Sequence, residues 1–253
     1  MDPGALGLQR RALGAWMDVM AHSSPKAALY RAEGVIAALV PACPERSIVN
    51  CVTYRDAGAL ADALEDLARA YAEAGVRAWT VWVPEGDAEV PALLEAAGHR
   101  LDGEPAAMHL ELERLEGPRT TGLDWDDRAS AEEVGLLNDL AYGYEPGGGL
   151  SAAIGPGPER LPTRLYRARE SGEVACVMQT IDVDDDCFVT FVATLERFRG
   201  RRLASRLLGA ALAQARERGL RTSTLQSSML GRGVYERLGY EVAFGLRLYE
   251  RRG

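Results

Sequence analysis

A stretch rich in arginine and glycine, RGRRLAS at 199–205, joins an apolar strand-like run to an amphipathic helix. The strand is expected at 187–194, and the helix from about residue 200 to 218. The first N–H groups of a helix lack acceptors within the helix and carry partial positive charge, so they bind anions such as phosphate. The sequence therefore predicts either a phosphate site here or an ordinary strand–helix turn whose arginines face water.

The elements expected on the two sides of segment 116–122 follow one order. Before it we expect helices at 5–20, 57–74 and 88–97 and strands at 34–40, 47–53, 78–83 and 106–113. After it we expect helices at 131–142, 200–218 and 231–238 and strands at 163–170, 173–182, 187–194, 221–227 and 241–250. Local signals support this second set: Ser130 and Glu133 form a capping-box pattern, Gly172 suits a hairpin turn, and Gly219 suits a helix C-terminus.

The two parts also align with each other. At one constant offset, Gly75 and Arg77 fall on Gly219 and Arg221. Repeated element order with matching residues is typical of duplication. The sequence therefore predicts a first unit at 1–115, a linker at 116–122 and a second unit at 123–253.

The motif RGRRLA (199–204) and the later motif GVYERLGYEV (233–242) together resemble the GNAT superfamily of acetyl-CoA-dependent N-acetyltransferases. The resemblance covers about 120–250, and a weaker one covers 1–115. It implies an α/β (α+β) fold made of two tandem GNAT-like domains. Each would have a mixed, mostly antiparallel twisted sheet flanked by helices, with the first domain a degenerate copy.

The resemblance also implies roles for individual residues. Acetyl-CoA would be the acyl donor, with its pyrophosphate on the backbone N–H groups of the loop and its pantetheine arm paired with the preceding strand. Tyr235 would be the general acid that protonates the departing thiolate, although its spacing from Leu238 also suits a core aromatic. The residues placed on the coenzyme are Val192, Ala193, Thr194, Arg199, Gly200, Arg201, Arg202, Leu203, Ala204, Ser205 and Ser228.

Some positions depart from the family pattern. Arg202 stands where the family usually has glycine, which a side chain would tolerate if the residue were already helical and pointed outward. Glu196 replaces a common proline. In the first part Asp56 overlies Gly200 and Leu94 overlies Tyr235, so that copy is expected to bind no coenzyme.

The general base and the acceptor site carry weaker signals. Residues 184–186 are all aspartate, a pattern more typical of a charged hairpin turn than of a base. Tyr142 and Tyr144 precede the glycine- and proline-rich stretch 146–157, which we expect at the acceptor entrance.

Composition narrows the function classes. The 253 residues include 37 acidic and 29 basic ones, for a net charge of −8, which argues against nucleic acid as a partner. No apolar run is long enough for a membrane helix, so no membrane partner is expected. The four cysteines and three histidines have no metal-ligand spacing, so no metal is expected, and scattered cysteines favour the cytoplasm.

The resemblance thus implies an N-acetyltransferase that moves an acetyl group from acetyl-CoA to a primary amine of a small molecule. Two alternatives stay open: a non-catalytic acyl-CoA-binding module, and a protein N-acetyltransferase. A homodimer is compatible with all three of these functions.

Overall fold

The computed structural model describes residues 2–117, 120–145, 149–155 and 158–253. Part of the predicted linker (118–119) and part of the predicted acceptor entrance (146–148 and 156–157) lie outside these residues. The helices are α1 (Pro3–His22), α2 (Ala57–Glu73), α3 (Val90–Ala96), η1 (Leu112–Arg114), α4 (Ala131–Ala141), α5 (Leu150–Ala153), η2 (Glu196–Phe198), α6 (Leu203–Glu217) and α7 (Arg232–Glu236). Within the described residues, none of these helices has the length and apolarity that a membrane span requires.

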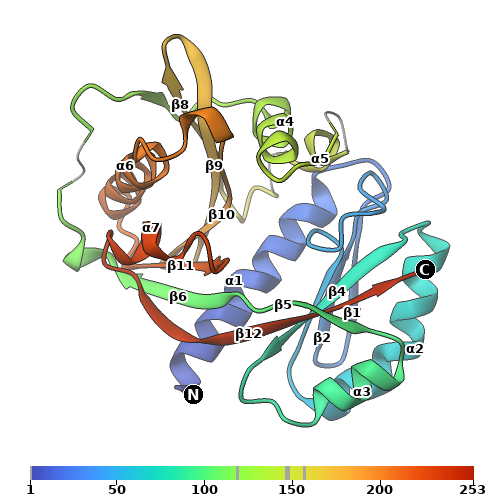
Figure 1. Ribbon diagram of the computed structural model, residues 1–253. Helices are drawn as coiled ribbons and strands as arrows, with labels where there is room; N and C mark the ends of the chain where they lie inside the picture. Colours follow the sequence, from blue (N-terminus) through green and yellow to red (C-terminus); the bar gives the residue numbers. More distant parts are fainter. Residues whose placement is uncertain (1, 118–119, 146–148, 156–157) are drawn as a thin grey trace.

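The strands form one twisted sheet with helices on its faces (Figure 1). They are β1 (Ala28–Ala32), β2 (Val35–Leu39), β3 (Cys51–Tyr54), β4 (Ala78–Pro84), β5 (Arg100–Gly103), β6 (Ala106–Glu111), β7 (Asp124–Asp126), β8 (Thr163–Glu170), β9 (Glu173–Val183), β10 (Asp186–Thr194), β11 (Thr222–Ser227) and β12 (Glu241–Arg252). The order is β1-β2-β3-β4-β12-β6-β11-β10-β9-β8-β7, with β5 also paired to β12. Only the β3–β4 and β10–β11 ladders are parallel among the described strands. The predicted mixed α/β fold with a mostly antiparallel sheet is confirmed.

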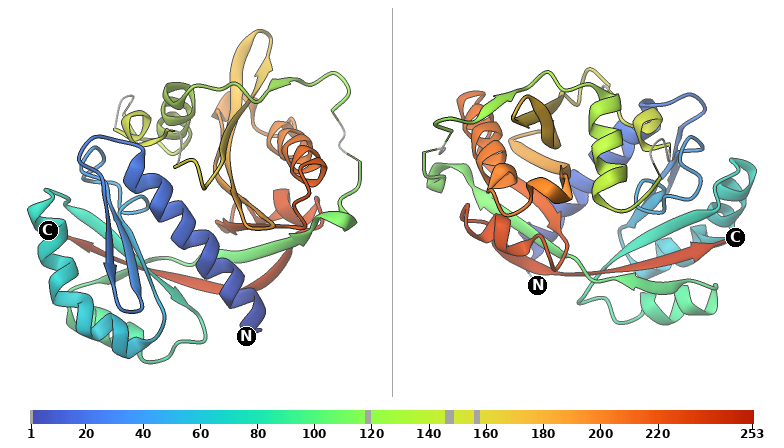
Figure 2. Two further views of the ribbon diagram at one scale, coloured as in Figure 1. Left: turned by 180° about the vertical axis from the view of Figure 1, so that it is seen from behind. Right: turned by 45° about the horizontal axis from the view of Figure 1, so that its top comes forward.

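Two strands connect the parts of the sheet that carry β1–β4 and β7–β11. Strand β6 belongs to the first part of the sequence but lies between β11 and β12. Strand β12 pairs with β6 through residues 241–245 and then with β4 through residues 246–252. Figure 2 shows β12 as one long arrow that extends from one side of the molecule to the other. Each part of the sheet is therefore completed by a strand from the other part of the sequence.

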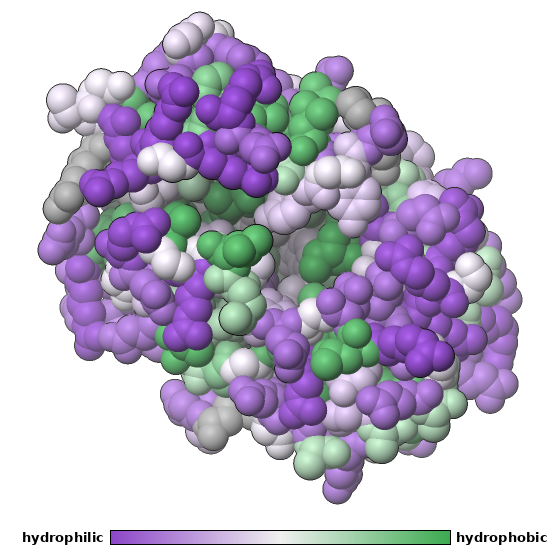
Figure 3. Space-filling view, viewed as in Figure 1, coloured by the Kyte–Doolittle hydropathy of each residue, from purple (hydrophilic) through white to green (hydrophobic). Residues whose placement is uncertain are grey.

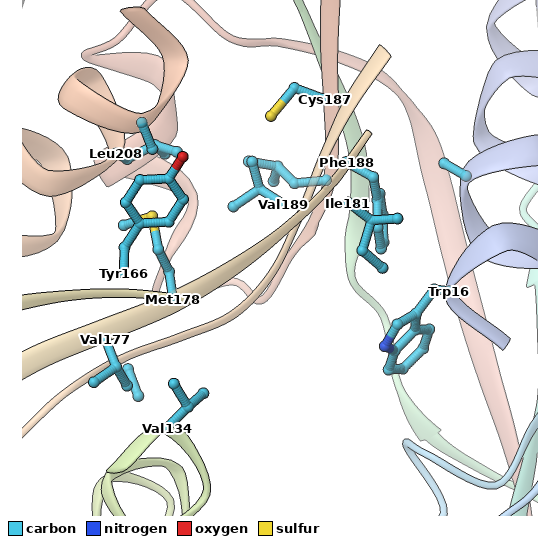
Figure 4. Packing of buried hydrophobic residues seen from close by; sticks show 14 of the residues in the cluster. Trp16, Val134, Tyr166, Val177, Met178, Ile181, Cys187, Phe188, Val189 and Leu208 are labelled. Atoms are coloured by element: carbon cyan, nitrogen blue, oxygen red, sulfur yellow. The ribbon is translucent and has the colours of Figure 1, made fainter. Parts of the chain in front are cut away.

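Helix α1 crosses between these two parts (Figure 1). Trp16 lies within ring-contact distance of Trp82 on one side and of Phe188 and Phe191 on the other. Figure 4 shows Trp16 beside Phe188 and Ile181, on the sheet face opposite the one where Leu208 of α6 meets Met178. This continuous apolar core holds α1 against both parts, since buried apolar contact is the main source of folding free energy.

One buried polar residue of α1 adds to this core. The Gln9 amide Nε2 donates to the carbonyls of Met108 (3.0 Å) and Leu225 (3.4 Å), and its Oε1 accepts from Gln226 (2.7 Å). Gln9 therefore joins α1 to β6 and β11 at the place where the two parts of the sequence meet.

Most expected elements are confirmed, and the differences have local causes. Both predicted capping-box bonds form, Gly172 and Gly219 have positive φ angles, and all four cysteines are buried. The strand expected at 47–53 is wrong at its start, because β3 begins at residue 51 after a hydrogen-bonded loop. The elements β1, β5, β7 and α5, of three to five residues each, were not expected.

Candidate functional site

The parallel strands β10 and β11 pair for only part of their length. Pairing joins Asp186–Val189 to Thr222–Leu225. Beyond it, β10 gains an extra residue relative to β9 between Thr190 and Ala193, and Phe191 has a φ of +52°. Such a bulge bends a strand and interrupts its ladder. Beyond Val189 and Leu225, β10 and β11 are therefore unpaired with each other within the described chain, and this unpaired region is referred to as the gap between β10 and β11.

The backbone of Val192 and Thr194 is directed away from β9. The Val192 carbonyl accepts from the Tyr142 hydroxyl (3.4 Å), and the Thr194 carbonyl accepts from Arg199 Nε (3.3 Å). Both donors lie outside the sheet, whereas the buried Ala193 between them pairs with Val177 of β9. This alternation is that of a strand edge able to accept another extended chain.

The arginine-rich loop follows η2 and ends at α6. Gly200 (φ +79°) and Arg202 (φ +60°) both adopt left-handed conformations, and α6 begins at Leu203. Within the described residues, no hydrogen bond uses the backbone N–H groups of residues 200–205 as donors. The helix was expected to start at about residue 200, so the prediction is wrong by three residues. A side chain at position 202 was expected to be tolerated only if the residue were helical, and Arg202 is not helical.

The arginines of this loop have different surroundings. Arg199 donates to the Ala141 carbonyl (2.6 Å) at the end of α4, and Arg201 donates to Glu170 (2.9 Å). The Arg202 guanidinium is exposed and contacts no acceptor among the residues described. Of the three, Arg202 alone is available to an external anion without giving up a protein partner, whereas Arg199 ties the loop to α4.

Tyr235 of α7 is 9% exposed, and its ring packs edge-on against Tyr240 at 6.0 Å. Burial raises the pKa of Tyr235 well above its ordinary value, and the neighbouring Tyr142 raises it further. The phenol therefore keeps its proton at neutral pH. Its hydroxyl bonds to no other described residue. The exposed Ser228 accepts the Gly231 N–H (3.2 Å) and so helps to form the turn before α7.

The aspartates at 184–186 divide into two kinds. Asp184 and Asp185 form the exposed turn between β9 and β10, as the sequence indicated. Asp186 is not a solvated turn residue, since it is 1% exposed and accepts from Thr222 (2.7 Å) and Thr224 (2.5 Å). Burial raises the pKa of Asp186 to about 6.

The first part of the sequence has a similar arrangement with different chemistry. Strands β3 and β4 pair in parallel only through Cys51–Val52 and Thr80–Val81. The helix that follows β3 is capped by its own Asp56 carboxylate, which accepts the Ala59 N–H at 2.9 Å. This hydrogen bond, with those of Arg55, lowers the pKa of Asp56. A carboxylate therefore lies where an anion would otherwise meet the N-terminus of α2.

Three residues that hold α4 in place, Arg46, Asn138 and Asp139, were not predicted from the sequence. Asn138, which is 5% exposed, donates to the Phe191 carbonyl (2.9 Å) at the bulge. The fully buried Asp139 forms an ion pair with Arg46. Asn138 and Asp139, two adjacent polar residues that interrupt the apolar second half of α4, were a signal that could have been noted. Arg46 gave none.

The surface near this site is hollowed. Figure 3 shows a depression near the centre of the face, between the part that carries α4 and α6 and the part that carries α2 and α3.

Within the described residues, no three His, Cys, Asp or Glu side chains gather as a metal site requires.

Comparison with known proteins addresses the family. Residues 144–240 match the model of the Acetyltransferase (GNAT) family, a segment that includes β10, the 199–205 loop, α6 and Tyr235. No curated protein sequence matches the chain.

Solved structures share the fold. A GCN5-related N-acetyltransferase from Kribbella flavida has a TM-score of 0.69 and 20% identity, over 96% of this chain and 95% of its own. A GNAT-family acetyltransferase from Novosphingobium aromaticivorans has a TM-score of 0.60 and 18% identity, over 97% and 98%. A tandem GNAT protein from the clavulanic acid biosynthesis pathway has a TM-score of 0.60 and 13% identity, over 97% and 95%. The family model thus matches residues 144–240, and the solved structures, at 20% identity or less, show that the fold is shared over nearly the whole chain.

Proposed function

We propose that this chain is an acetyl-CoA-dependent N-acetyltransferase that acts on a primary amine of a small molecule. The observation that carries the proposal is the set of unpartnered N–H groups at 200–205, which lie at the start of α6. Several backbone donors at a helix N-terminus suit a pyrophosphate, and the segment belongs to the part that matches the family model. The exposed Arg202 and the backbone of Leu203, Ala204 and Ser205 would hold the phosphates.

The gap between β10 and β11 would hold the pantetheine arm. Its amide groups would pair with the outward-facing backbone of Val192 and Thr194, as in strand addition. In the structure the Tyr142 hydroxyl donates to the Val192 carbonyl at 3.4 Å, and Arg199 Nε donates to the Thr194 carbonyl at 3.3 Å. The Tyr142 bond is long, so exchanging it for a ligand amide costs little.

Tyr235 would act as the general acid. The acceptor nitrogen attacks the thioester carbonyl, the C–S bond breaks, and the Tyr235 hydroxyl gives its proton to the sulfur while the nitrogen loses a proton to solvent. Tyr235 holds a proton at neutral pH, as a general acid must before the reaction, and its place in the segment that matches the family model supports this role. No carboxylate is assigned as base.

The chain would be a tandem of two GNAT-like units, 1–115 and 123–253, joined by residues 116–122. Supporting this, β1-β2-β3-β4 and β8-β9-β10-β11 have the same pairing: two antiparallel ladders and then a parallel one. The first unit would bind no acetyl-CoA, because Asp56 occupies its anion position and the buried Leu94 replaces the tyrosine. The first unit instead walls the central hollow, which favours a small acceptor over a protein.

The test is release of CoA thiol from acetyl-CoA in the presence of a panel of small primary amines. We expect turnover with at least one amine, and Tyr235→Phe should reduce it without weakening acetyl-CoA binding. Binding of acetyl-CoA without turnover on any amine or peptide would instead support a non-catalytic acyl-CoA-binding module. Turnover only on peptides would support a protein N-acetyltransferase.

A further inference from the structure

We propose that Arg46, which lies outside the GNAT-matched segment, is a positioning residue that fixes the bulge of β10 and the 199–205 loop through the end of α4. The proposal deepens the proposed function and rests on it for its meaning in catalysis. Arg46 is 6% exposed and lies in the loop 40–50 between β2 and β3. Its partner on α4, Asp139, is fully buried.

The loop presents Arg46 rigidly. The buried Asn50 side chain accepts from the Val40 N–H (2.7 Å) and donates to the carbonyls of Cys43 (2.8 Å) and Arg46 (3.1 Å). Every polar group of this amide side chain is therefore used to close the loop. The position of Arg46 is thus tied to the start of β3, which Asn50 directly precedes.

The last turn of α4 and the residues after it bind Arg46 in two ways. Besides the Asp139 ion pair, the Arg46 guanidinium lies 3.2 Å from the centre of the Tyr144 ring. The Tyr144 N–H donates to the Asp139 carbonyl (2.9 Å), so both partners belong to one compact turn. Arginine suits this place because its planar group stacks on a ring while it pairs with a carboxylate.

The same turn makes three contacts with the candidate site. Asn138 donates to the Phe191 carbonyl at the bulge, the Ala141 carbonyl accepts from Arg199, and Tyr142 donates to the Val192 carbonyl. These residues flank Asp139 on both sides. A displacement of this turn would therefore move the strand edge and the phosphate loop together.

Stability alone does not account for the pair. Burying two charges costs desolvation free energy, and here Arg46 Nε and Asp139 Oδ2 also lack partners among the described residues. An apolar pair of similar volume would often be as stable. What an apolar pair would not supply is a directional contact that fixes the end of α4 in one place.

The test compares Arg46→Lys with Glu45→Gln. The lysine keeps the charge but loses the planar fork and ring stacking. Glu45 is the adjacent residue and is exposed. Among the residues that the structure describes it pairs only with Arg77 and Arg252, away from α4, so Glu45→Gln is the matched control. The double variant Arg46→Met with Asp139→Leu removes both charges and so avoids an unpaired buried carboxylate. The readouts are hydrogen exchange, peptide by peptide, and calorimetric titration with acetyl-CoA.

We expect amide exchange in 190–199, a segment that contains hydrogen-bonded amides such as those of Leu195 and Arg199, to rise about ten-fold in Arg46→Lys and in the double variant, with a similar loss of acetyl-CoA affinity. Exchange in β3 and β4 should keep the wild-type rate, and Glu45→Gln should match the wild type throughout. Folded Arg46 variants with wild-type exchange in 190–199 would overturn the proposal. If the wild type binds no acetyl-CoA, the proposed function fails, and the exchange rates alone still decide the role of Arg46.

Discussion

The buried carboxyl group of Asp186 makes a quantitative test of the structure possible. Its pKa of about 6 in the folded protein exceeds the ordinary value of 3.8, because burial disfavours the ionised form more than the Thr222 and Thr224 hydroxyls favour it. The folded protein therefore holds this proton more tightly than the unfolded chain does. Its contribution to stability is complete below about pH 3.8 and is lost as the pH rises through about 6.

The size of the effect follows from the shift. The difference between a pKa of 3.8 in the unfolded chain and about 6 in the folded protein corresponds to about 3 kcal/mol in the free energy of unfolding, at about 1.4 kcal/mol per pH unit. Between pH 4 and pH 8, the free energy of unfolding of the wild type should fall by about 2 to 3 kcal/mol relative to that of Asp186→Asn, which cannot ionise. Urea unfolding at several pH values measures this difference.

The control is Asp184→Asn, which removes one exposed negative charge from the same turn. Parallel pH profiles for the wild type and Asp186→Asn would refute the buried, raised-pKa description. The position of Asp186 in β10 also bears on whether its carboxylate could be the catalytic base. Asp186 lies five residues before Phe191, which is roughly 16 Å along an extended strand. Asp186 is therefore too far from the bulge to act directly as a base there.

Further predictions concern single residues. Tyr235→Phe should lower turnover about 100-fold with unchanged acetyl-CoA affinity, as measured by thiol release and calorimetry, and equal turnover would remove the general acid. Gln9→Leu should cost about 1 to 3 kcal/mol in urea unfolding, because its bonds to β6 and β11 are lost. Arg202→Gly should stabilise the protein by about 1 kcal/mol in the same assay, since glycine adopts a left-handed conformation without strain, and destabilisation would contradict that backbone geometry. Asp56→Ala should lower the melting temperature, because the carboxylate that caps α2 is lost. The decrease should be smaller at acid pH, where this carboxylate is protonated in both the folded and the unfolded protein.

Local patterns were sufficient for the elements that present a long apolar face. The helix at α6 and the hairpin of β8 and β9 were predicted within a few residues, because their signals lie in neighbouring positions. The start of α6 was placed three residues early, since nothing in the sequence marks Arg202 as left-handed. Short edge strands such as β7 carry too few residues to show a period.

Long-range arrangements were beyond sequence patterns. Strand β6 has the same apolar pattern whichever sheet it joins, so its place between β11 and β12 could not be read from residues 106–111. Arg46 and Asp139 are 93 residues apart in sequence, and nothing near Arg46 in the sequence marks it as buried or as the partner of Asp139. The candidate coenzyme residues came instead from motif resemblance, and the structure adds the contacts around them.

The proposed coenzyme site requires that a pyrophosphate binds the backbone N–H groups of residues 200–205. A crystal structure of the protein grown with acetyl-CoA tests it most directly. We expect density for two phosphates within hydrogen-bonding distance of these N–H groups, with the arm extending between β10 and β11 towards Tyr235. Acetyl-CoA bound instead between β3 and β4, or a complex in which the 200–205 N–H groups contact no phosphate, would contradict it.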